Sequence, residues 1–480
     1  MLLNIEKMIY GGDGLARLPA GSLGNKDRGP GKAVFVPFVL AGEKIEATLT
    51  EEKSGFARAR AAAIVEPSPH RIQPDCPYFS RCGGCHYQHA SYEHQLEIKK
   101  EILRENLRRI AKVDLQCEIQ VHPAPPWNYR NRSRLQVRTR PDEFAAGYFK
   151  FASHELLPVE ECPISSPLIN RGIAMLWQAG RAGEAVEGVR EVEFFASSDA
   201  DGNETRLLVE FLCAPEARRA AVRAWAEDLC AAMPEIAGVV AFREPQKGVQ
   251  EPLVTVGASE LTYHTRSAAF RVSAGSFFQT NRFLIDELIN IVTADRSGEL
   301  ALDLYAGVGV FSTALAWNFR HVVAVESSQT SAADLQYNLA TNGQAVRSAT
   351  EQYLQATYAG SVHAGSAHAG SARAGAGGRP MQSRSETERG RVGKGALPQK
   401  VVHRPDLIVV DPPRSGLGDR VAGALASANA PRITYVSCDP ATLARDLVPL
   451  QAAGYRVEAA HLVDLFPQTY HLETIVQLVR

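Results

Sequence analysis

The sequence lacks three features that would place it in a special class of protein. It has no run of about 18 or more apolar residues, which excludes a transmembrane helix. Its net charge is only −1, so the overall charge identifies no partner. Eight cysteines in 480 residues are too few for a disulfide scaffold. The N-terminus has no apolar core behind a basic start, so we expect no signal peptide and a cytoplasmic location, where cysteines stay reduced.

The chain does have an ordinary globular composition, with 45% hydrophobic and 22% charged residues. At about 150 residues per domain, its length predicts about three domains. Its charge is unevenly distributed, because residues 1–150 contain 23 Lys and Arg against 17 Asp and Glu. This part therefore carries +6 and the remainder −7. A basic N-terminal third on an acidic remainder predicts a polyanion-binding module attached to something else.

Three kinds of pattern follow one another along the chain. Short alternating apolar runs, broken by Gly-rich turns, predict a small β-barrel over residues 1–68. Residues 69–265 contain a cysteine cluster and mixed strands and helices, which indicate a central α+β domain. Residues 266–480 alternate apolar strands with helical stretches, which predicts a parallel, doubly wound α/β sheet. Within that domain, residues 357–400 carry tandem HAGSA repeats and almost no large apolar side chains, so we expect disorder there.

A basic helix is predicted over residues 91–111. Its apolar residues recur at helical spacing, and its other faces carry Lys99, Lys100, Arg104, Arg108 and Arg109. We expect the apolar face to pack on the C-terminal domain and the basic residues to help hold a polyanion.

A row of arginines follows in YRNRSRLQVRTR, residues 129–140. The arginines occupy even positions: Arg130, Arg132, Arg134, Arg138 and Arg140. In a strand these guanidinium groups would share one face, which suits contacts to phosphates. The alternative is a charged edge strand that prevents further pairing. We expect nucleic acid to bind at Arg130, Arg132, Arg134 and Arg138.

Polar loops follow the predicted strands of the C-terminal domain. DLYAGVGVFS, residues 303–312, places glycines such as Gly307 between a strand and a helix, where a backbone can approach a ligand closely. Glu326 ends the next strand and suits a ribose diol. Ser312 stands where a dinucleotide motif has its third glycine, which favours S-adenosylmethionine over NAD. Asp411, in DPPRSGL, also follows a strand and should lie at the ligand-binding edge.

Two further loops carry reactive groups. Cys438, in YVSCDP, follows a strand, and a thiolate is the natural nucleophile for an electron-poor ring carbon. Glu473 precedes the last apolar strand and is a candidate general base beside such a nucleophile. The alternative roles are a buried structural cysteine and a surface carboxylate.

Four cysteines form a candidate metal site: Cys76, Cys82, Cys85 and, far along the chain, Cys162. Four thiolates can hold a [4Fe–4S] cluster or a zinc ion. Three clustered cysteines and one remote cysteine favour the iron–sulfur cluster, because structural zinc sites more often show two close pairs. His86 is a possible zinc ligand and keeps zinc open.

The motifs FFQTN, DLYAGVG, DPPRSGL, SCDP and PQTYHLE occur in this order and resemble the RNA uracil-C5 methyltransferase family. The barrel looks like a TRAM domain, and with the cysteines it resembles the iron–sulfur branch that methylates 23S ribosomal RNA. The resemblance implies a Rossmann-like class I methyltransferase domain at the C-terminus. It implies contacts to S-adenosylmethionine from Gln279, Tyr305, Glu326 and Asp411. Cys438 would be the nucleophile, Glu473 the base, and the four cysteines the cluster ligands.

The resemblance implies methylation of C5 of a uridine in RNA, with 23S ribosomal RNA favoured as the substrate. The same chemistry on the T-loop uridine of tRNA is one alternative. A non-catalytic RNA-binding factor that kept the fold is another, and it rests on Val310, which replaces an asparagine common in the family. We expect RNA as the partner, no membrane or obligate protein partner, and a monomer.

Overall fold

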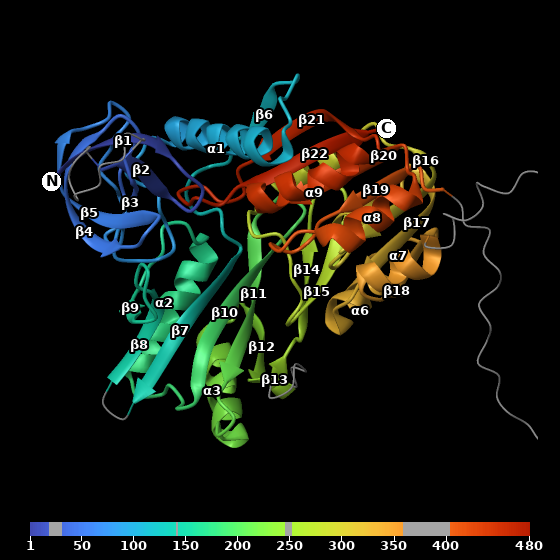
Figure 1. Cartoon of the computed structure of the whole chain (residues 1–480). Coiled ribbons are helices and arrows are strands. Elements are labelled where there is room, and N and C mark those ends of the chain that lie inside the picture. Colours follow the sequence, from blue (N-terminus) through green and yellow to red (C-terminus); the bar gives the residue numbers. More distant parts are fainter. Residues whose placement is uncertain (19–30, 141–142, 245–251, 359–403) are drawn as a thin grey trace, which may run out of the picture.

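A computed structural model describes residues 1–18, 31–140, 143–244, 252–358 and 404–480. They form a closed barrel, a seven-stranded sheet and an eight-stranded sheet (Figure 1). In this described part, every helix is too short or too polar to span a bilayer. Of the segment expected to be disordered, residues 357 and 358 are the end of helix α7 (Thr350–Tyr358), and the rest lies outside the described residues.

The N-terminal barrel joins five strands in the order β1-β2-β3-β5-β4, which confirms the expected small barrel. The strands are β1 (Leu2–Met8), β2 (Asp13–Arg17), β3 (Ala33–Pro37), β4 (Lys44–Glu52) and β5 (Phe56–Glu66). Inward-facing residues such as Val34, Val36 and Ile45 are fully buried, because alternate side chains of each strand point into the closed core.

The central sheet has the strand order β13-β12-β11-β10-β7-β8-β9. Its strands are β7 (Arg132–Arg140), β8 (Glu143–Phe149), β9 (Leu156–Pro158), β10 (Val189–Ser198), β11 (Glu204–Cys213), β12 (Ile236–Arg243) and β13 (Pro252–Gly257). Helices α2 (Pro167–Arg181) and α3 (Arg219–Ala232) pack on it around a shared apolar core. Gly180 permits this packing, because a Cβ there would lie 2.1 Å from the Phe144 ring.

The C-terminal sheet has the order β18-β17-β16-β19-β20-β22-β21-β6. Its C-terminal strands are β16 (Gly298–Leu304), β17 (Phe319–Glu326), β18 (Gly343–Arg347), β19 (Leu407–Val410), β20 (Arg432–Ser437), β21 (Arg456–Val463) and β22 (Glu473–Val479). Strands β16 to β20 pair in parallel, and β22 runs antiparallel between β20 and β21. The expected doubly wound α/β domain is therefore observed.

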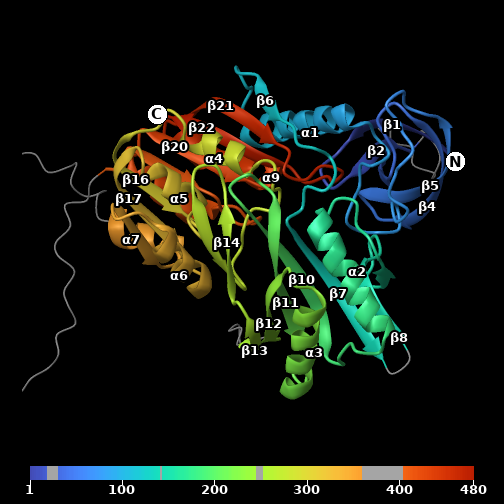
Figure 2. The ribbon, with the colours of Figure 1, turned by 180° about the vertical axis from the view of Figure 1, so that it is seen from behind.

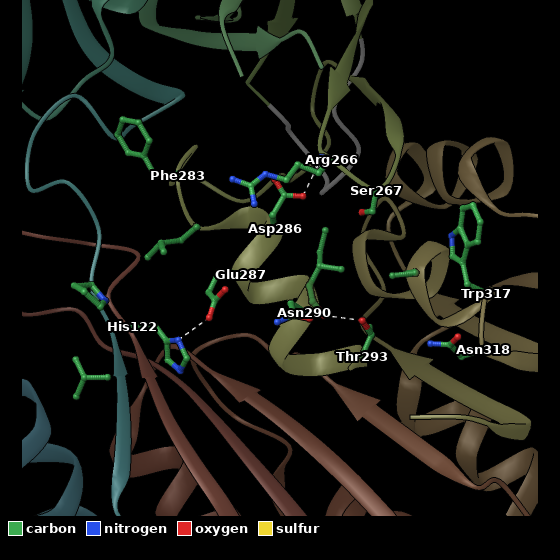
Figure 3. A pocket seen from close by; sticks show the side chains of 15 residues that line it. His122, Arg266, Ser267, Phe283, Asp286, Glu287, Asn290, Thr293, Trp317 and Asn318 are labelled. Atoms are coloured by element: carbon green, nitrogen blue, oxygen red, sulfur yellow. Dashed lines mark hydrogen bonds and ion pairs between the residues drawn. The ribbon is translucent and has the colours of Figure 1, made fainter. Parts of the chain in front are cut away.

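The eighth strand, β6 (Ile119–His122), comes from the middle of the chain and pairs in parallel with β21. Its last residue fixes it on two sides. His122 Nδ1 lies 2.8 Å from Oε1 of Glu287 of α4 (Ile285–Thr293) (Figure 3). Its Nε2 lies 3.1 Å from Nδ1 of His461. The pocket drawn in Figure 3 lies beside this contact and has a volume of about 940 Å³. The sequence pattern had predicted no strand of this sheet within residues 69–265.

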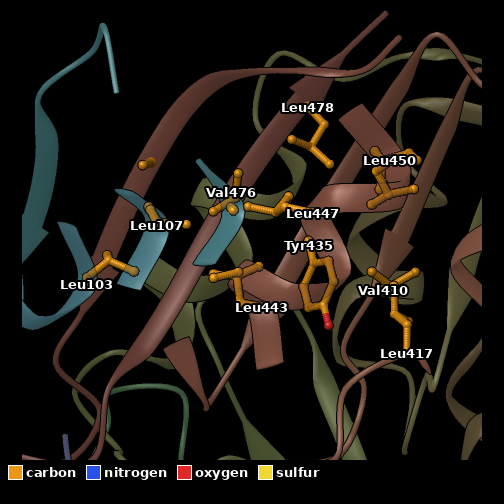
Figure 4. Close-up of a cluster of buried hydrophobic side chains, with 14 of the residues drawn as sticks. Leu103, Leu107, Val410, Leu417, Tyr435, Leu443, Leu447, Leu450, Val476 and Leu478 are labelled. Atoms are coloured by element: carbon orange, nitrogen blue, oxygen red, sulfur yellow. The ribbon is translucent and has the colours of Figure 1, made fainter. Parts of the chain in front are cut away.

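Helices cover both faces of the C-terminal sheet. One face packs against α1 (Tyr92–Asn106), the π-helical turn η1 (Leu107–Ala111), α8 (Gly418–Ala428) and α9 (Pro440–Ala452) (Figure 4). The other packs against α4, α5 (Val310–Leu315) and the hairpin β14 (Glu260–His264) and β15 (Ala269–Ser273), seen from behind in Figure 2. A further helix, α6 (Gln329–Asn338), lies against β15, β17 and β18.

One basic residue of the predicted helix does not face solvent. Lys99 is fully buried, and its Nζ donates to Asp464 Oδ1 at 2.6 Å and to the Phe466 carbonyl at 2.9 Å. The expectation that Lys99 helps to hold RNA is therefore wrong. The physical reason is that its position on α1 faces the loop between β21 and β22, where a buried carboxylate requires a cation.

Candidate active site

The expected catalytic residues meet at one edge of the C-terminal sheet. Cys438 directly follows β20, and Glu473 is the first residue of β22. Because these strands run antiparallel with Ser437 opposite Thr474, the end of one strand adjoins the beginning of the other. Asp411 follows β19, the parallel neighbour of β20, so it lies at the same edge of the sheet. The structure thus brings together three residues that are far apart in the sequence.

Burial raises the pKa of both reactive groups. Burial first, and then the charge of the nearby Glu473, raise the pKa of the Cys438 thiol to about 12. The pKa of Glu473 is also raised well above its ordinary value, first by burial and then by the charge of Asp411. Burial therefore disfavours the charged form of each group, and nearby positive charge favours it.

Arg414 is the cation that acts on both groups. Its charge lowers the pKa of Cys438 and of Glu473. Its guanidinium group lies against the His471 ring, with Nη2 3.2 Å from Nδ1. Burial and Arg414 lower the pKa of His471 to about 3, so this imidazole is neutral and can accept a hydrogen bond from the guanidinium group. The sequence had given no role to Arg414, although the motif DPPRSGL contains it.

The loop between β16 and α5 has the backbone of a ligand cradle. Tyr305 adopts a left-handed conformation with φ 64°, which is uncommon for a residue with a side chain. Gly307 also has positive φ, and a Cβ at this position would meet no atom within 4 Å. Its N–H donates to Glu326 Oε2 at 3.0 Å, and the Ser328 N–H donates to Oε1 at 2.6 Å. The structure therefore joins Glu326 to the glycine loop, and its contact to a ribose stays a prediction.

Two buried carboxylates lie at the ends of the neighbouring strands β16 and β19. Burial raises the pKa of Asp303 and that of Asp411 to about 7 each, and the charge of Asp303 contributes to the shift of Asp411. Ser312 donates a hydrogen bond to Asp303 Oδ2, whereas Oδ1 is buried without a partner. Such a pair favours a cation between or beside the two groups. Asp303 had no assigned role, and its place in DLYAGVG was the only signal for it.

Two further residues bear on cofactor binding: Gln279, an expected contact, and Val310, which replaces a family asparagine. Gln279 lies in the segment between β15 and α4, and its carbonyl accepts from Asn131 Nδ2 at 3.0 Å. Val310 begins α5 and is 7% exposed, because it packs in the apolar cluster on the sheet face. Its replacement of asparagine is therefore accommodated by the core.

Backbone contacts hold the loop that leads to Glu473. The carbonyl of Gln468 accepts from the N–H groups of His86 and Tyr87, each at 2.9 Å. The Gln468 N–H donates to Gln95 Oε1 at 2.9 Å, and Tyr129 Oη donates to the Pro467 carbonyl at 3.0 Å. Segments next to the cysteine cluster thus position the candidate base.

The four cysteines Cys76, Cys82, Cys85 and Cys162 line one cavity of about 250 Å³. Burial raises the pKa of the first three, and the charge of Cys162 contributes to each shift. In the described ranges, no group of three or more His, Cys, Asp or Glu residues is placed so that it could hold a single metal ion. His86, the possible zinc ligand, packs its ring against Tyr470 with 4.6 Å between centroids.

The arginine row is shorter than expected. β7 begins at Arg132, and Arg130 lies outside it, with its side chain on the cysteine cavity. Arg132 is 14% exposed and donates to the Ser276 carbonyl at 2.7 Å. Arg134 forms an ion pair with Glu193 of the adjacent strand. Arg132, Arg134, Arg138 and Arg140 do share one face of β7, as expected, whereas Arg130 lies outside the strand. Arg134 and Arg138 are exposed on that face and remain candidate RNA contacts.

Comparisons with known proteins agree with this geometry. A family model described as tRNA (uracil-5-)-methyltransferase matches residues 91–360 and 401–480. An uncharacterised RNA methyltransferase of Streptomyces coelicolor is 31% identical over 475 residues, which are 93% of this chain and 88% of the relative. One of Caldanaerobacter subterraneus subsp. tengcongensis is 29% identical over 485 residues, 96% of each chain.

A solved structure shares the fold. The Pyrococcus abyssi tRNA (uracil-54, C5)-methyltransferase in complex with S-adenosyl-L-homocysteine matches with a TM-score of 0.68 and 22% identity, over 100% of both chains. This likeness confirms the expected barrel, central domain and Rossmann-like methyltransferase domain.

Proposed function

Because the chain belongs to the tRNA (uracil-5-)-methyltransferase family, and is therefore an RNA methyltransferase that uses S-adenosylmethionine, we propose that it acts on C5 of uridine through a covalent Cys438 adduct. The observation that carries this proposal is the pairing of β20 with β22, which sets a thiol beside a carboxyl group at the ligand edge. We propose that it acts as a monomer on a folded RNA, whose target base must leave its stack to reach Cys438.

The reaction requires these two groups because C5 of uracil is a poor nucleophile. Attack of the Cys438 thiolate on C6 forms an S–C6 bond and shifts electrons to an enolate. C5 then displaces the methyl group from the sulfonium, which leaves S-adenosylhomocysteine. Glu473 accepts the C5 proton, and the S–C6 bond breaks as the double bond re-forms. The products are 5-methyluridine, S-adenosylhomocysteine and one proton, held by Glu473.

The cofactor itself supplies charge that this site lacks when free. Asp303 and Asp411 form an acidic pair that suits the positive sulfonium. Positive charge there lowers the pKa of Glu473, so that Glu473 can ionise and accept a proton. Arg414 supports the thiolate in the same way.

We favour 23S ribosomal RNA as the substrate, on the combination of barrel and cysteine cluster. The tRNA T-loop uridine is the alternative, and the name of the Pyrococcus abyssi protein keeps it open. The non-catalytic alternative loses its support, because Val310 lies in the core and both reactive residues occupy the active-site edge.

We further propose that the four cysteines hold a [4Fe–4S] cluster. The residues fit, because four sulfur ligands share one cavity, and Arg130 and Arg134 also line it, where they would offset thiolate charge. A zinc ion needs four ligands within about 2.3 Å of one point, which requires closer sulfur atoms than a four-iron cluster does. When bound, the cluster would tie Cys162 to the three clustered cysteines. Iron and sulfide analysis of protein purified without oxygen should give about four of each per chain.

The deciding experiment incubates purified protein and labelled S-adenosylmethionine with 23S ribosomal RNA and tRNA transcripts side by side. Mass spectrometry of the nucleosides identifies the product. We expect 5-methyluridine in ribosomal RNA. The same product in tRNA alone would keep the mechanism and overturn the substrate.

Two variants separate the catalytic roles. Cys438→Ala should abolish the covalent adduct, because no thiolate is left to attack C6. Glu473→Gln should instead trap the adduct, because the C5 proton stays in place. RNA that migrates with the protein on a denaturing gel reports the adduct. A normal methylation rate in either variant would refute the assignment.

A further inference from the structure

The turn between β1 and β2 of the barrel reaches the nucleophile. Tyr10, at this turn, donates its hydroxyl hydrogen to the carbonyl oxygen of Cys438 at 3.2 Å, across 428 residues of sequence. The Tyr10 ring packs edge-on against Tyr470, with 5.6 Å between centroids. A residue of the N-terminal barrel therefore contacts the loop of the nucleophile and the loop of the base.

The turn itself is fitted to this place. Gly12 has φ 93°, which favours glycine, and a Cβ here would lie 3.1 Å from Cβ of His86. His86 in turn stacks edge-on against Tyr470. The turn, the cysteine segment and the loop of Glu473 thus form one packed junction around the carbonyl of Cys438.

Polar and apolar contacts attach the barrel to the rest of the molecule and so hold the turn in place. Glu43 of the barrel is fully buried and accepts from Arg71 Nη2 at 2.7 Å and from the Ser68 N–H at 3.2 Å. Met8, at the end of β1, belongs to the apolar core of the C-terminal sheet. A charged contact from Lys7 to Glu105 of α1 completes the attachment.

From this geometry we infer that Tyr10 is a positioning residue for Cys438, so that the barrel is part of the catalytic centre as well as a module that holds RNA. The inference rests on the proposed function. The Tyr10 hydroxyl fixes the carbonyl of Cys438, and this fixes the direction from which the thiolate attacks C6. A misplaced nucleophile lowers the rate of attack without changing how the RNA is held.

The test compares Tyr10→Phe with a matched control, Tyr455→Phe. Tyr455 also donates to a backbone carbonyl, that of Ala430 at 2.7 Å. This contact lies in the C-terminal domain with Cys438, but between the segments that precede β20 and β21. Tyr10→Phe should lower kcat by about tenfold, the effect of about 1.4 kcal/mol. It should lower the rate of adduct formation with RNA containing 5-fluorouridine equally, and leave KM for RNA within about twofold. The control, Tyr455→Phe, should match the wild type in kcat, in the rate of adduct formation and in KM for RNA.

A second pair of variants tests the turn as a whole. Gly12→Ala and Gly42→Ala both place a side chain at positive φ, but only Gly12 faces another residue, whereas a Cβ at Gly42 meets nothing within 4 Å. Gly12→Ala should reproduce the loss in kcat, and Gly42→Ala should not.

The outcomes distinguish the two proposals. Wild-type protein that forms neither adduct nor 5-methyluridine would refute the proposed function. If the wild type is active, equal rates for it and Tyr10→Phe would overturn the positioning role. A raised KM for RNA with unchanged kcat would overturn it as well, since Tyr10 would then be an RNA contact.

Discussion

Cys438 is a weak nucleophile until its surroundings supply positive charge. Its thiol has a pKa raised to about 12, and Arg414 is the residue whose charge opposes that shift. The thiolate is the reactive form, so the reactivity of Cys438 rises with pH as the pKa is approached. The same arginine also acts on Glu473, which makes it the electrostatic centre of the site.

Replacing Arg414 by glutamine should therefore raise the pKa of Cys438 further and reduce its thiolate fraction at any given pH. If the pKa rises by about one unit, alkylation of Cys438 by iodoacetamide at pH 8 slows by about tenfold. Peptide mass spectrometry follows this one cysteine among eight. Arg420→Gln, an exposed arginine on α8, is the control. Equal alkylation rates of Cys438 in the two variants would contradict the role of Arg414.

The pair Asp303 and Asp411 should make cofactor binding depend on pH. Both pKa values are raised to about 7, so the pair is protonated below that pH and ionised above it. S-Adenosylmethionine, which carries a sulfonium charge, should bind more tightly at pH 8 than at pH 6. S-Adenosylhomocysteine, with a neutral sulfur, should change less. Calorimetry measures both, and Asp411→Asn should remove most of the difference. Parallel pH profiles for the two ligands would exclude the pair as the sulfonium site.

At the scale of elements, the loop between β21 and β22 depends on contacts from α1. The buried ion pair of Lys99 and Asp464 is its strongest anchor, because both side chains are fully buried. Tyr92 Oη donates to the same carboxylate at 3.0 Å, and Lys99 also binds the Phe466 carbonyl. A helix of the N-terminal half thus holds the loop that leads to Glu473, the proposed base.

Lys99→Met should destabilise the protein by about 3–5 kcal/mol, because it leaves the Asp464 carboxylate buried without its cation. Urea unfolding followed by circular dichroism measures the loss. The adjacent Lys100 pairs with Glu118, which is 81% exposed, so Lys100→Met should cost less than about 1 kcal/mol. A similar small loss in both variants would show that the buried pair contributes little.

Local signals predicted most of these elements. The strand expected before Asp411 is β19, a short apolar run, and the helix expected at 91–111 is α1 followed by η1, because its apolar residues recur at helical spacing. Strand β6 has only four residues, and its pairing with β21 depends on tertiary contacts that no local pattern encodes.

The distinction between local patterns and tertiary contacts also explains which site residues could be predicted. Cys438, Glu473 and Asp411 could be predicted, because each follows or begins an apolar strand within a recognisable motif. Tyr10 and Lys99 could not, because their roles arise from packing between segments more than 350 residues apart. Charge alone misled in the case of Lys99, since a basic residue on a helix is usually solvated.

At the scale of the whole molecule, the uneven charge of the chain now has a structural setting. The segment with net positive charge, residues 1–150, includes the barrel, the cysteine segment, α1, β6 and two strands of the central sheet, β7 and β8. Figure 1 shows the barrel and β7 on the left of the molecule, opposite α7 and β18. We therefore expect this side of the molecule to attract a polyanion.

Arg138→Gln should therefore weaken RNA binding severalfold and make it less dependent on salt. Removing one contact to a phosphate reduces the slope of log affinity against log salt by about 0.7–0.9. Filter binding at several potassium chloride concentrations measures both effects. Arg223→Gln, an arginine of α3 that is 44% exposed, is the control with the same charge change. An unchanged slope for Arg138→Gln would remove β7 from the RNA-binding surface.

The pairing of β6 with β21 also governs how the protein is made. His122 and its partner His461 are separated by 339 residues, so β6 leaves the ribosome long before the strand that completes it exists. At about 5–20 residues per second, the wait is roughly 20–70 s. During that time the apolar face of α1 and the unpaired edge of β6 are exposed on the nascent chain. Synthesis rate and chaperone supply should therefore limit the yield of this enzyme more than the stability of the finished fold does.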